Sequence, residues 1–214
     1  MNVLVCGGAG FIGSEFIRNH LKNNSDSKLT NLDILTIGSN LQNLKNIENN
    51  PNYSFIKENI TNESIIDGIV KDVDVIVNFA AESHVDRSIS NPKPFLETNI
   101  MGTYSILEAV RKYDKKFIHV STDEIYGDAY GQDSFDEESQ INPSNPYAAT
   151  KAAADNLVAS YHRTYGINCI ITRCTNNFGP FQFPEKLIPK TIIRSIKNLK
   201  VPLYGDGMQI RSWI

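Results

Sequence analysis

Short apolar runs, rich in Val, Ile and Leu, alternate along the chain with longer segments whose apolar residues recur at helical spacing. Each short run predicts a buried strand, because a strand covered on both faces is apolar almost throughout. The predicted strands cover residues 2–7, 28–35, 53–60, 73–81, 116–122 and 167–174. The helical spacing predicts helices over residues 11–24, 62–71, 92–113 and 145–166. This alternation indicates an α/β fold with a doubly wound parallel Rossmann sheet.

The pattern changes after residue 174. A loop rich in Asn, Gly, Pro and aromatic residues follows, and then a helix is predicted over residues 185–199. Two short strands are predicted for residues 201–207 and 209–214, so the chain ends at Ile214 inside a strand. We therefore expect one domain over residues 1–174 and the incomplete start of a second over residues 175–214.

Composition narrows the class of protein. The 214 residues are 41% hydrophobic and carry a net charge of −3, with Lys and Arg scattered, which argues against a nucleic-acid partner. The N-terminus lacks the features of a signal peptide, and no apolar run approaches the roughly 18 residues of a membrane span. Cys6, Cys169 and Cys174 form no CxxC motif. We expect buried thiols in a reducing, cytoplasmic compartment, and no metal site.

A glycine-rich turn joins the first predicted strand to the first helix. Gly7 permits the tight turn, Gly10 lets the backbone approach a pyrophosphate, and Gly13 allows close packing of helix on strand. Asp33 follows at the end of the second strand, where a carboxylate can accept hydrogen bonds from ribose hydroxyls and repel a 2′-phosphate. The turn therefore predicts NAD as cofactor; the alternative is a glycine-rich turn without a ligand.

A tyrosine and a lysine share one face of the helix predicted over residues 145–166. Tyr147 and Lys151 are four positions apart, and Thr122 ends the strand before this helix. A lysine ammonium stabilises a nearby phenolate, so we expect it to lower the tyrosine pKa. Such a base suits the oxidation of an alcohol that gives hydride to NAD. The alternative is an ordinary surface pair.

Two adjacent carboxylates, Asp123 and Glu124, follow Thr122 directly. Ligands of an open parallel sheet bind beyond the carboxyl ends of its strands, so this pair is expected at the rim of the cleft. A simple oxidation needs no further acids, whereas elimination of water needs a base and an acid. The alternative is a solvated acidic loop, which is how we interpret residues 135–140.

Seven segments together resemble the dTDP-glucose 4,6-dehydratases of the extended short-chain dehydrogenase/reductase superfamily. They are GGAGFIGSEF, NFAAESHVDRSI, ETNIMGTYSILEAVR, STDEIYGD, NPYAATKAAAD, NNFGPFQFPEKLIPK and YGDGMQIRSW. The glycine turn and YxxxK are shared across the superfamily, whereas STDEIYGD and AAESHVDRSI are more specific. The resemblance implies an NAD-dependent lyase that converts a nucleoside diphosphate glucose into the 4-keto-6-deoxy sugar nucleotide.

The resemblance also implies residue roles. Tyr147, assisted by Thr122 and Lys151, would deprotonate the C4 hydroxyl, Glu124 would remove the C5 proton, and Asp123 would protonate the departing C6 hydroxyl. The implied NAD-binding residues are Gly7, Gly10, Phe11, Ile12, Gly13, Asp33, Ile34, Leu35, Thr36, Asn59, Ile60, Phe79, Ala80, Ala81, Glu82, Ser83, Thr98, Tyr147, Lys151 and Asn177. The implied substrate-binding residues are Ser83, Thr122, Asn176, Lys186, Leu187, Ile188, Pro189, Lys190, Pro202, Leu203, Tyr204 and Arg211.

Some positions depart from the family pattern. Asn59 stands where Asp is usual before Ile60, Ile34 replaces a usual Lys, and Ser212 replaces a usual Asp. Family members continue well beyond Ile214, so the resemblance implies a C-terminally truncated chain. The helices over residues 92–113 and 145–166 are expected to pair in a homodimer.

Several alternative functions remain open. Plant-type UDP-glucose 4,6-dehydratases share these motifs, so the nucleotide base is not settled. A sugar-nucleotide 4-epimerase or decarboxylase is disfavoured by the Asp123–Glu124 pair. An alternative of another class is an inactive NAD-binding fragment, or one half of a split enzyme.

Overall fold

The computed structural model describes residues 1–129 and 134–214. The chain forms two compact units, Met1–Cys174 and Thr175–Ile214, which are described separately below. No helix in the described part of the chain is both long and apolar enough to cross a lipid bilayer.

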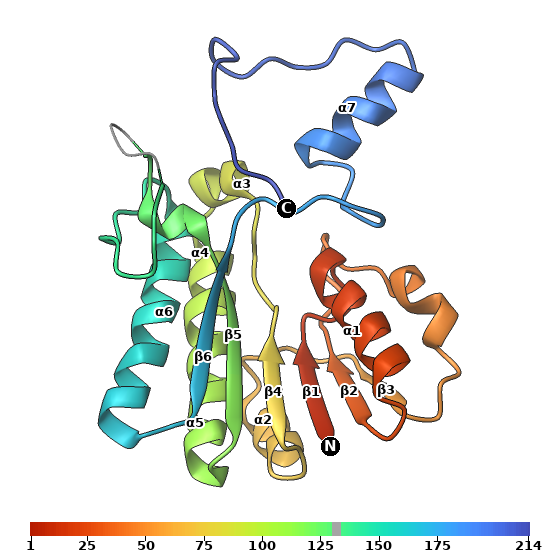
Figure 1. Ribbon diagram of the computed structural model, residues 1–214, viewed down its shortest axis with the longest axis vertical. Coiled ribbons are helices and arrows are strands. Elements are labelled where there is room, and N and C mark those ends of the chain that lie inside the picture. Colours follow the sequence, from red (N-terminus) through yellow and green to blue (C-terminus); the bar gives the residue numbers. More distant parts are fainter. Residues whose placement is uncertain (130–133) are drawn as a thin grey trace. The chain divides into compact units, whose positions relative to one another are not determined.

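The first unit is built on a parallel sheet of six strands, in the order β3-β2-β1-β4-β5-β6 (Figure 1). The strands are β1 (Asn2–Cys6), β2 (Lys28–Leu32), β3 (Tyr53–Ile56), β4 (Val75–Asn78), β5 (Lys116–Thr122) and β6 (Cys169–Cys174). This order reverses direction between β1 and β4, as in doubly wound nucleotide-binding sheets. The predicted fold class is confirmed.

Helical segments connect these strands. The α-helices are α1 (Phe11–Asn23), α2 (Glu63–Val70), α3 (Val85–Ser90), α4 (Lys93–Phe95), α5 (Thr103–Tyr113) and α6 (Pro146–Tyr165). The other segments are the 3₁₀ helices η1 (Leu41–Ile47) and η3 (Asp123–Tyr126) and the π-helix η2 (Leu96–Gly102). Helix α6 ends at Gly166, whose left-handed φ of 72° suits glycine at a helix end.

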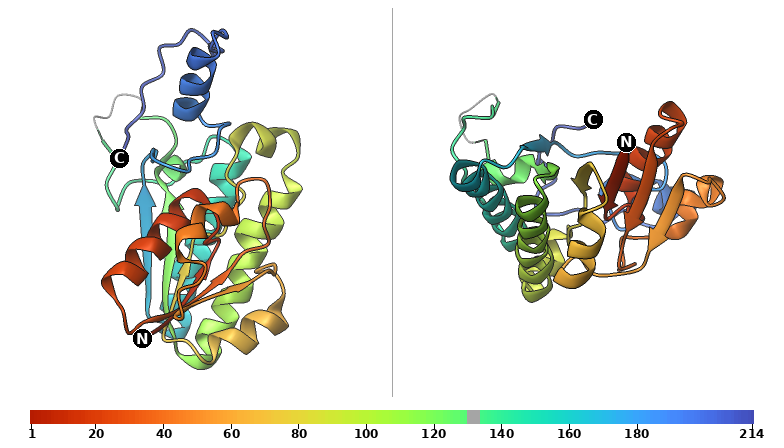
Figure 2. Two further views of the ribbon diagram at one scale, coloured as in Figure 1. Left: turned by 90° about the vertical axis from the view of Figure 1, so that its right-hand side faces the viewer. Right: turned by 90° about the horizontal axis from the view of Figure 1, so that it is seen from below.

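Alternate residues of the inner strands enter two separate cores, because successive side chains of a strand point to opposite faces. On β1, Leu4 and Cys6 join the core beneath α2, α5 and α6, whereas Val3 and Val5 join the core beneath α1 and η1. Figure 2 shows helices on both faces of the sheet. This two-sided burial explains why the strand sequences are nearly continuous in apolar residues.

The helix predicted over residues 92–113 is present as one unbroken helical run from Lys93 to Tyr113, and its middle part is the π-helix η2. The Thr103 hydroxyl donates to the carbonyl of Asn99 (2.7 Å), and the Ser105 hydroxyl donates to that of Met101 (3.0 Å). Hydroxyl groups that bond to the carbonyl four residues earlier compete with the regular helix ladder and distort it. Apolar periodicity predicted the helix but does not reveal this local change of its hydrogen-bond pattern.

The second unit contains one helix, α7 (Leu187–Ile196), and irregular chain around it. The two strands predicted over residues 201–207 and 209–214 are absent from this fully described unit, apart from an isolated parallel bridge between Asn176 and Trp213. Strands need paired neighbours and a buried face, and no side chain of residues 175–214 is buried. That prediction was wrong.

The thiols also differ from expectation. Cys6 is fully buried, and burial together with the negative charge of Asp33 raises the pKa of its thiol to about 12. Cys169 and Cys174 are only half-buried. All three cysteines are free.

We expect Phe117→Ala to destabilise the first unit by about 3–5 kcal/mol, the usual cost of emptying a buried phenylalanine site. Phe117 lies on β5 and is completely buried in the core beneath α5 and α6. Urea unfolding of the wild-type protein and of the variant measures this loss of stability. Ile170→Ala is the control, because Ile170 on the neighbouring strand is 46% exposed. An equal loss in both variants would contradict the assignment of this core.

Candidate active site

The functional residues predicted in the first unit follow the carboxyl ends of β1, β2, β3, β4 and β5, or lie on α1, η2 and α6. Because all six strands are parallel, these ends lie along one edge of the sheet (Figure 1). The topology therefore places the glycine turn, Asp33 and the acidic pair at the same edge, although Asp33 lies 20 residues after Gly13 and 90 residues before Asp123 in the sequence.

The glycine turn is shaped by close backbone contacts. Gly7 has a φ of +75°, and its N–H donates to the carbonyl of Leu32 at 2.9 Å. A Cβ at Gly7 would lie 2.5 Å from the backbone nitrogen of Ala80, and one at Gly13 would lie 2.5 Å from the Gly7 oxygen. Gly10 has no such crowding and caps the N-terminus of α1. Close backbone contacts therefore account for glycine at positions 7 and 13 of the turn, but not at position 10.

Asp33 is 4% exposed and accepts hydrogen bonds on both carboxylate oxygens. Oδ2 accepts from the Ala9 N–H (2.9 Å) and the Ser39 hydroxyl (3.2 Å), and Oδ1 accepts from the Leu35 N–H (2.8 Å). The carboxylate thus ties the turn after β2 to the glycine turn. Each oxygen can accept more than one bond, so the group fits a ribose as well.

The other residues predicted to bind the cofactor in this unit are partly committed to local bonds. The Asn59 Oδ1 accepts from the Thr61 N–H at 3.1 Å, and Ile60 is 4% exposed. The backbone N–H and carbonyl of Glu82 bond to the Asn99 amide at 2.9 and 3.1 Å. The rest lie on α1, after β2, after β4 and on η2: Phe11, Ile12, Ile34, Thr36, Phe79, Ala80, Ala81, Ser83 and Thr98.

Thr122 ends β5 and begins the short helix η3, which carries the acidic pair. Its hydroxyl oxygen accepts from the Glu124 N–H at 3.2 Å and lies 3.4 Å from the Asp123 Oδ1, to which it donates. A threonine in this capping position stops the strand and turns the chain. Both carboxylates are half-buried rather than fully solvated.

The N-terminus of α6 brings the tyrosine and the lysine to the acidic pair. The Asn145 Oδ1 caps the helix by accepting from the Ala148 N–H (2.9 Å), while its Nδ2 donates to the Glu124 Oε2 (3.4 Å). Tyr147 is 8% exposed, and its backbone N–H donates to the Ser88 hydroxyl at 3.1 Å. The structure therefore holds Tyr147 and Glu124 in one neighbourhood.

The predicted effect of the lysine on the tyrosine is contradicted. Burial and then the charge of Glu124 raise the pKa of Tyr147 well above its usual value, and a hydrogen bond with Thr122 opposes the rise only partly. Burial lowers the pKa of Lys151 to about 8. The Lys151 ammonium donates to the carbonyl of Val120 at 2.7 Å. The helical spacing placed the two groups correctly, but it carried no information about their desolvation.

The remaining predicted residues belong to the second unit. Lys186 caps α7, and residues 187–190 form its first turn. Asn176 donates to the carbonyl of Ser212 (3.2 Å), and Asn177 donates to that of Thr175 (2.8 Å). Pro202, Leu203, Tyr204 and Arg211 lie in exposed irregular chain.

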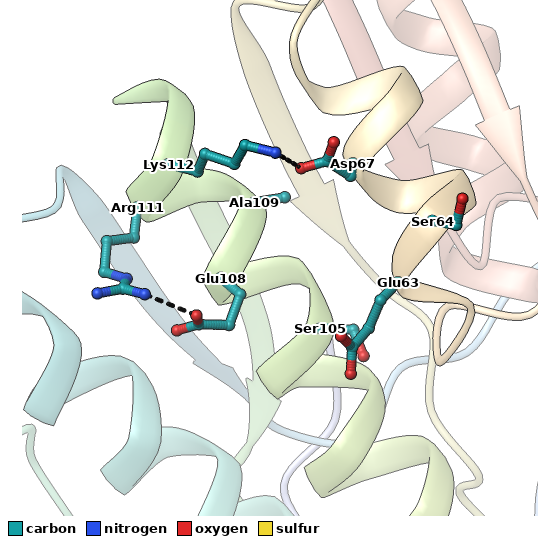
Figure 3. A pocket seen from close by; sticks show the side chains of 8 residues that line it. All are labelled: Glu63, Ser64, Asp67, Ser105, Glu108, Ala109, Arg111 and Lys112. Carbon is teal, nitrogen blue, oxygen red and sulfur yellow. Dashed lines mark hydrogen bonds and ion pairs between the residues drawn. The ribbon is translucent and has the colours of Figure 1, made fainter.

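A surface groove of about 540 Å³ lies elsewhere in the first unit, between α2 and α5 (Figure 3). Lys112 of α5 pairs with Asp67 of α2 across the groove at 2.7 Å. Arg111 pairs with Glu108 on the same helix, α5, also at 2.7 Å. None of the predicted site residues lines this groove, so we interpret it as a solvated surface. The described residues contain no group of three or more His, Cys, Asp or Glu side chains arranged to hold a metal.

The residues that hold the start of α6 in place were not predicted from the sequence. Asn145 and Ser88 hold the start of α6, and the buried Asn99 links Glu82 to the Thr150 hydroxyl (2.9 Å) on that helix. An asparagine directly before a proline is a helix-start signal that could have identified Asn145. Ser88 and Asn99 bond across long sequence separations, which no local pattern reveals.

Comparison with known proteins identifies the family. The family model described as "GDP-mannose 4,6 dehydratase" matches residues 4–214. The structure of dTDP-glucose 4,6-dehydratase from Bacillus anthracis in complex with NAD is 45% identical, with a TM-score of 0.93, over 100% of this chain and 67% of that one. This chain belongs to the dTDP-glucose 4,6-dehydratase family.

Two further family relatives support this. The chain is 49% identical to "Low-salt glycan biosynthesis protein Agl12" of Haloferax volcanii, over 100% of this chain and 69% of that protein. The dTDP-glucose 4,6-dehydratase DesIV of Streptomyces venezuelae, solved with NAD and TYD bound, is 43% identical with a TM-score of 0.94, over 100% and 68%. The chain thus spans about two thirds of the length of these relatives.

We expect Asn145→Ala to cost about 1 kcal/mol of stability, because it removes the N-cap of α6. Asn145→Ser restores a capping oxygen and should recover most of that loss, although it cannot reach Glu124 in the same way. Urea unfolding measures both. Asn62→Ala is the matched control, because it removes an asparagine N-cap from another helix, α2, and so measures the cost of losing such a cap away from Glu124. Equal losses in the Ala and Ser variants at position 145 would contradict the capping role.

Proposed function

We propose that this chain carries the catalytic residues of an NAD-dependent dehydration of a nucleoside diphosphate glucose, dTDP-glucose being the favoured substrate. The product would be the 4-keto-6-deoxy sugar nucleotide. The observation that carries the proposal is the position of the acidic pair. Asp123 and Glu124 begin where Thr122 ends β5, and the charge of Glu124 acts directly on Tyr147. An alcohol-oxidising group and an eliminating group therefore share one neighbourhood.

The residues of this chain would act in order on the sugar. Tyr147 takes the proton of the C4 hydroxyl, and the new C4 carbonyl acidifies the neighbouring C5–H bond. Glu124 removes the C5 proton while the C6–O bond breaks, and Asp123 protonates the leaving oxygen so that water departs. Glu124 then returns its proton to C5. When bound, NAD accepts the hydride from C4 and later delivers it to C6.

The raised pKa of Tyr147 bears on the first step. A phenolate next to a carboxylate in a buried site binds a proton strongly, so it is a strong base once it is deprotonated. An ordinary tyrosine is already neutral at pH 7, so the Tyr147 phenol is neutral in the free protein and would have to lose its proton before it can take that of the C4 hydroxyl. Lys151, buried one turn further along α6, is the cation available to oppose Glu124.

The glycine turn and Asp33 support NAD as the cofactor. The bonds from Ala9 and Leu35 fix the Asp33 carboxylate beside the glycine turn, where a ribose and a pyrophosphate would meet the chain. We propose that the first unit binds the cofactor and that Lys186 to Lys190, Pro202 to Tyr204 and Arg211 of the second unit contribute to the sugar nucleotide site. Arg211 suits a diphosphate, because a guanidinium binds it in a bidentate way.

Mass spectrometry of the product tests the proposed function. Purified protein is incubated with NAD and either dTDP-glucose or UDP-glucose, and a product lighter by one water is expected, with dTDP-glucose preferred. The same assay is run on a chimera that adds the remaining third of a relative to this chain. Formation of a C4 epimer without loss of water, by either protein, would overturn the proposal in favour of an epimerase.

Glu124→Gln should separate the two halves of the reaction. The variant keeps Thr122 and Tyr147, so oxidation at C4 should persist, as seen by NADH absorbance. Exchange of the C5 proton with D₂O should fall by about 10²-fold or more, the usual contribution of a general base. Glu137→Gln, in the acidic loop over residues 135–140, is the control. Normal C5 exchange in Glu124→Gln would exclude this residue as the base.

A further inference from the structure

Three ionisable side chains between α6 and the strands β5 and β6 are not used by the proposed reaction. Asp155 on α6 and His119 on β5 are each 1% exposed, and Arg173 on β6 bonds to Asp155. Ionised side chains are rarely buried unless they are paired, so such a group calls for an explanation.

The contacts of Asp155 place it between the helix and the sheet. It lies one helical turn beyond Lys151 on α6, so the two side chains share a helix face. Its Oδ2 accepts from the Arg173 Nε at 3.0 Å, and its Oδ1 lies 3.6 Å from the His119 Nε2. The carboxylate therefore bonds to the Arg173 guanidinium, and the buried Lys151 lies one turn away on the same helix, with its ammonium bonded to the carbonyl of Val120 and not directly to Asp155.

Arg173 extends these contacts to the acidic pair. Its Nη1 donates to the Tyr126 hydroxyl (2.8 Å) and to the carbonyl of Glu137 (3.3 Å), and the guanidinium lies 5.3 Å from the centre of the Tyr126 ring. Tyr126 is the last residue of η3, the helix that carries Asp123 and Glu124. One ion pair thus joins α6, β6 and the helix of the acidic pair.

We propose that Asp155 is a positioning residue that acts as the buried counter-ion of Lys151, and that Arg173 holds its carboxylate in place. Within the proposed function, on which this inference rests, the pair keeps Lys151 charged beside Tyr147. It also holds the base of η3 at a fixed distance from α6. Asp155 touches neither substrate nor cofactor in this role.

The charges around Lys151 support this role. Its ammonium is buried, which lowers its pKa to about 8, and the negative charge of Asp155 is the main influence that opposes the fall. Cys174 acts in the same direction, whereas Arg173 is not among the groups that shift this pKa. On β5, burial and the Lys151 charge lower the pKa of His119 well below its usual value, so His119 is neutral at pH 7.

The other ionisable groups near Lys151 and Asp155 have other interaction partners. On η3, Glu124 and Asp123 act on Tyr147, and the Tyr126 hydroxyl is held by Arg173. Asp155 itself has a raised pKa because of burial, and Arg173 opposes that rise. Without Arg173, the carboxyl would hold its proton more strongly and would lose its effect on Lys151.

The alternative is a purely structural ion pair. Replacing a buried pair by neutral groups is often harmless to stability, whereas removing one partner is costly because the other charge stays buried. Stability alone therefore cannot distinguish the two roles. The pKa of Lys151 can distinguish the two roles, because an ion pair that served only the fold would not change this pKa.

The test is a direct titration of Lys151 in the unbound protein, by NMR of lysine labelled with ¹³C at Cε. Lys151→Met identifies the resonance. We expect a pKa near 8 in the wild type and a value at least about one unit lower in Asp155→Asn, since a nearby opposite charge shifts a pKa by 1–3 units. Asp155→Asn combined with Arg173→Gln should show the same fall without leaving Arg173 unpaired.

Glu108→Gln is the matched control. Like Asp155, Glu108 accepts from an arginine on one side, Arg111 (2.7 Å), and it also accepts from the Tyr161 hydroxyl of α6 (2.6 Å). This variant should leave the titration of Lys151 unchanged. An unchanged Lys151 pKa in both Asp155 variants would overturn the proposal, and so would an equal fall in Glu108→Gln.

A kinetic measurement adds a second readout. If Lys151 must be charged, the alkaline limb of the kcat profile should move to lower pH in the double variant by the same amount as the Lys151 pKa, with little change in KM. A lowered Lys151 pKa without turnover of any nucleoside diphosphate glucose would refute the proposed function and leave the counter-ion assignment standing. A lowered pKa with an unmoved kcat profile would reject the catalytic relevance of the pair.

Discussion

The burial of one ammonium group constrains the whole site. Lys151 is 3% exposed on the face of α6 that packs on β5, and its ammonium donates to the carbonyl of Val120 at 2.7 Å. A charge in such a place is tolerated only when its surroundings are arranged around it. This bond fixes the position of α6 along β5. Because Tyr147 lies one turn earlier on α6 and Thr122 ends β5, the same bond decides where the phenol meets the acidic pair.

The sequence was informative where chemistry follows local pattern. Six apolar runs marked the six parallel strands, and the positions of Gly7, Gly13 and Asp33 predicted a tight turn tied to the end of β2, because each requirement is local. The spacing of Tyr147 and Lys151 likewise placed both on α6. What failed depended on distant contacts. The raised pKa of Tyr147 arises from burial beneath other elements and from the charge of Glu124.

Two kinds of ionic contact occur in the first unit, and their depth separates them. The pairs that line the groove between α2 and α5 lie at the surface, where water weakens the attraction and a lost pair costs little. The carboxylate of the Asp155–Arg173 pair is 1% exposed, so the loss of its partner would cost much more stability than the loss of a surface partner. The groove between α2 and α5 is therefore a poor guide to the chemistry of this unit, and the buried carboxylates are a better one.

The Asn145 side chain has two roles at once, in the stability of α6 and in the position of the Glu124 carboxylate. One end of its amide completes the first turn of a twenty-residue helix, and the other end contacts the carboxylate of Glu124. Serine, threonine or aspartate at this position could preserve the helix, yet none of them presents both a donor and an acceptor in the same geometry. Sequence drift at position 145 is consequently restricted more tightly than capping alone requires. Tolerated replacements should appear together with compensating changes near position 124.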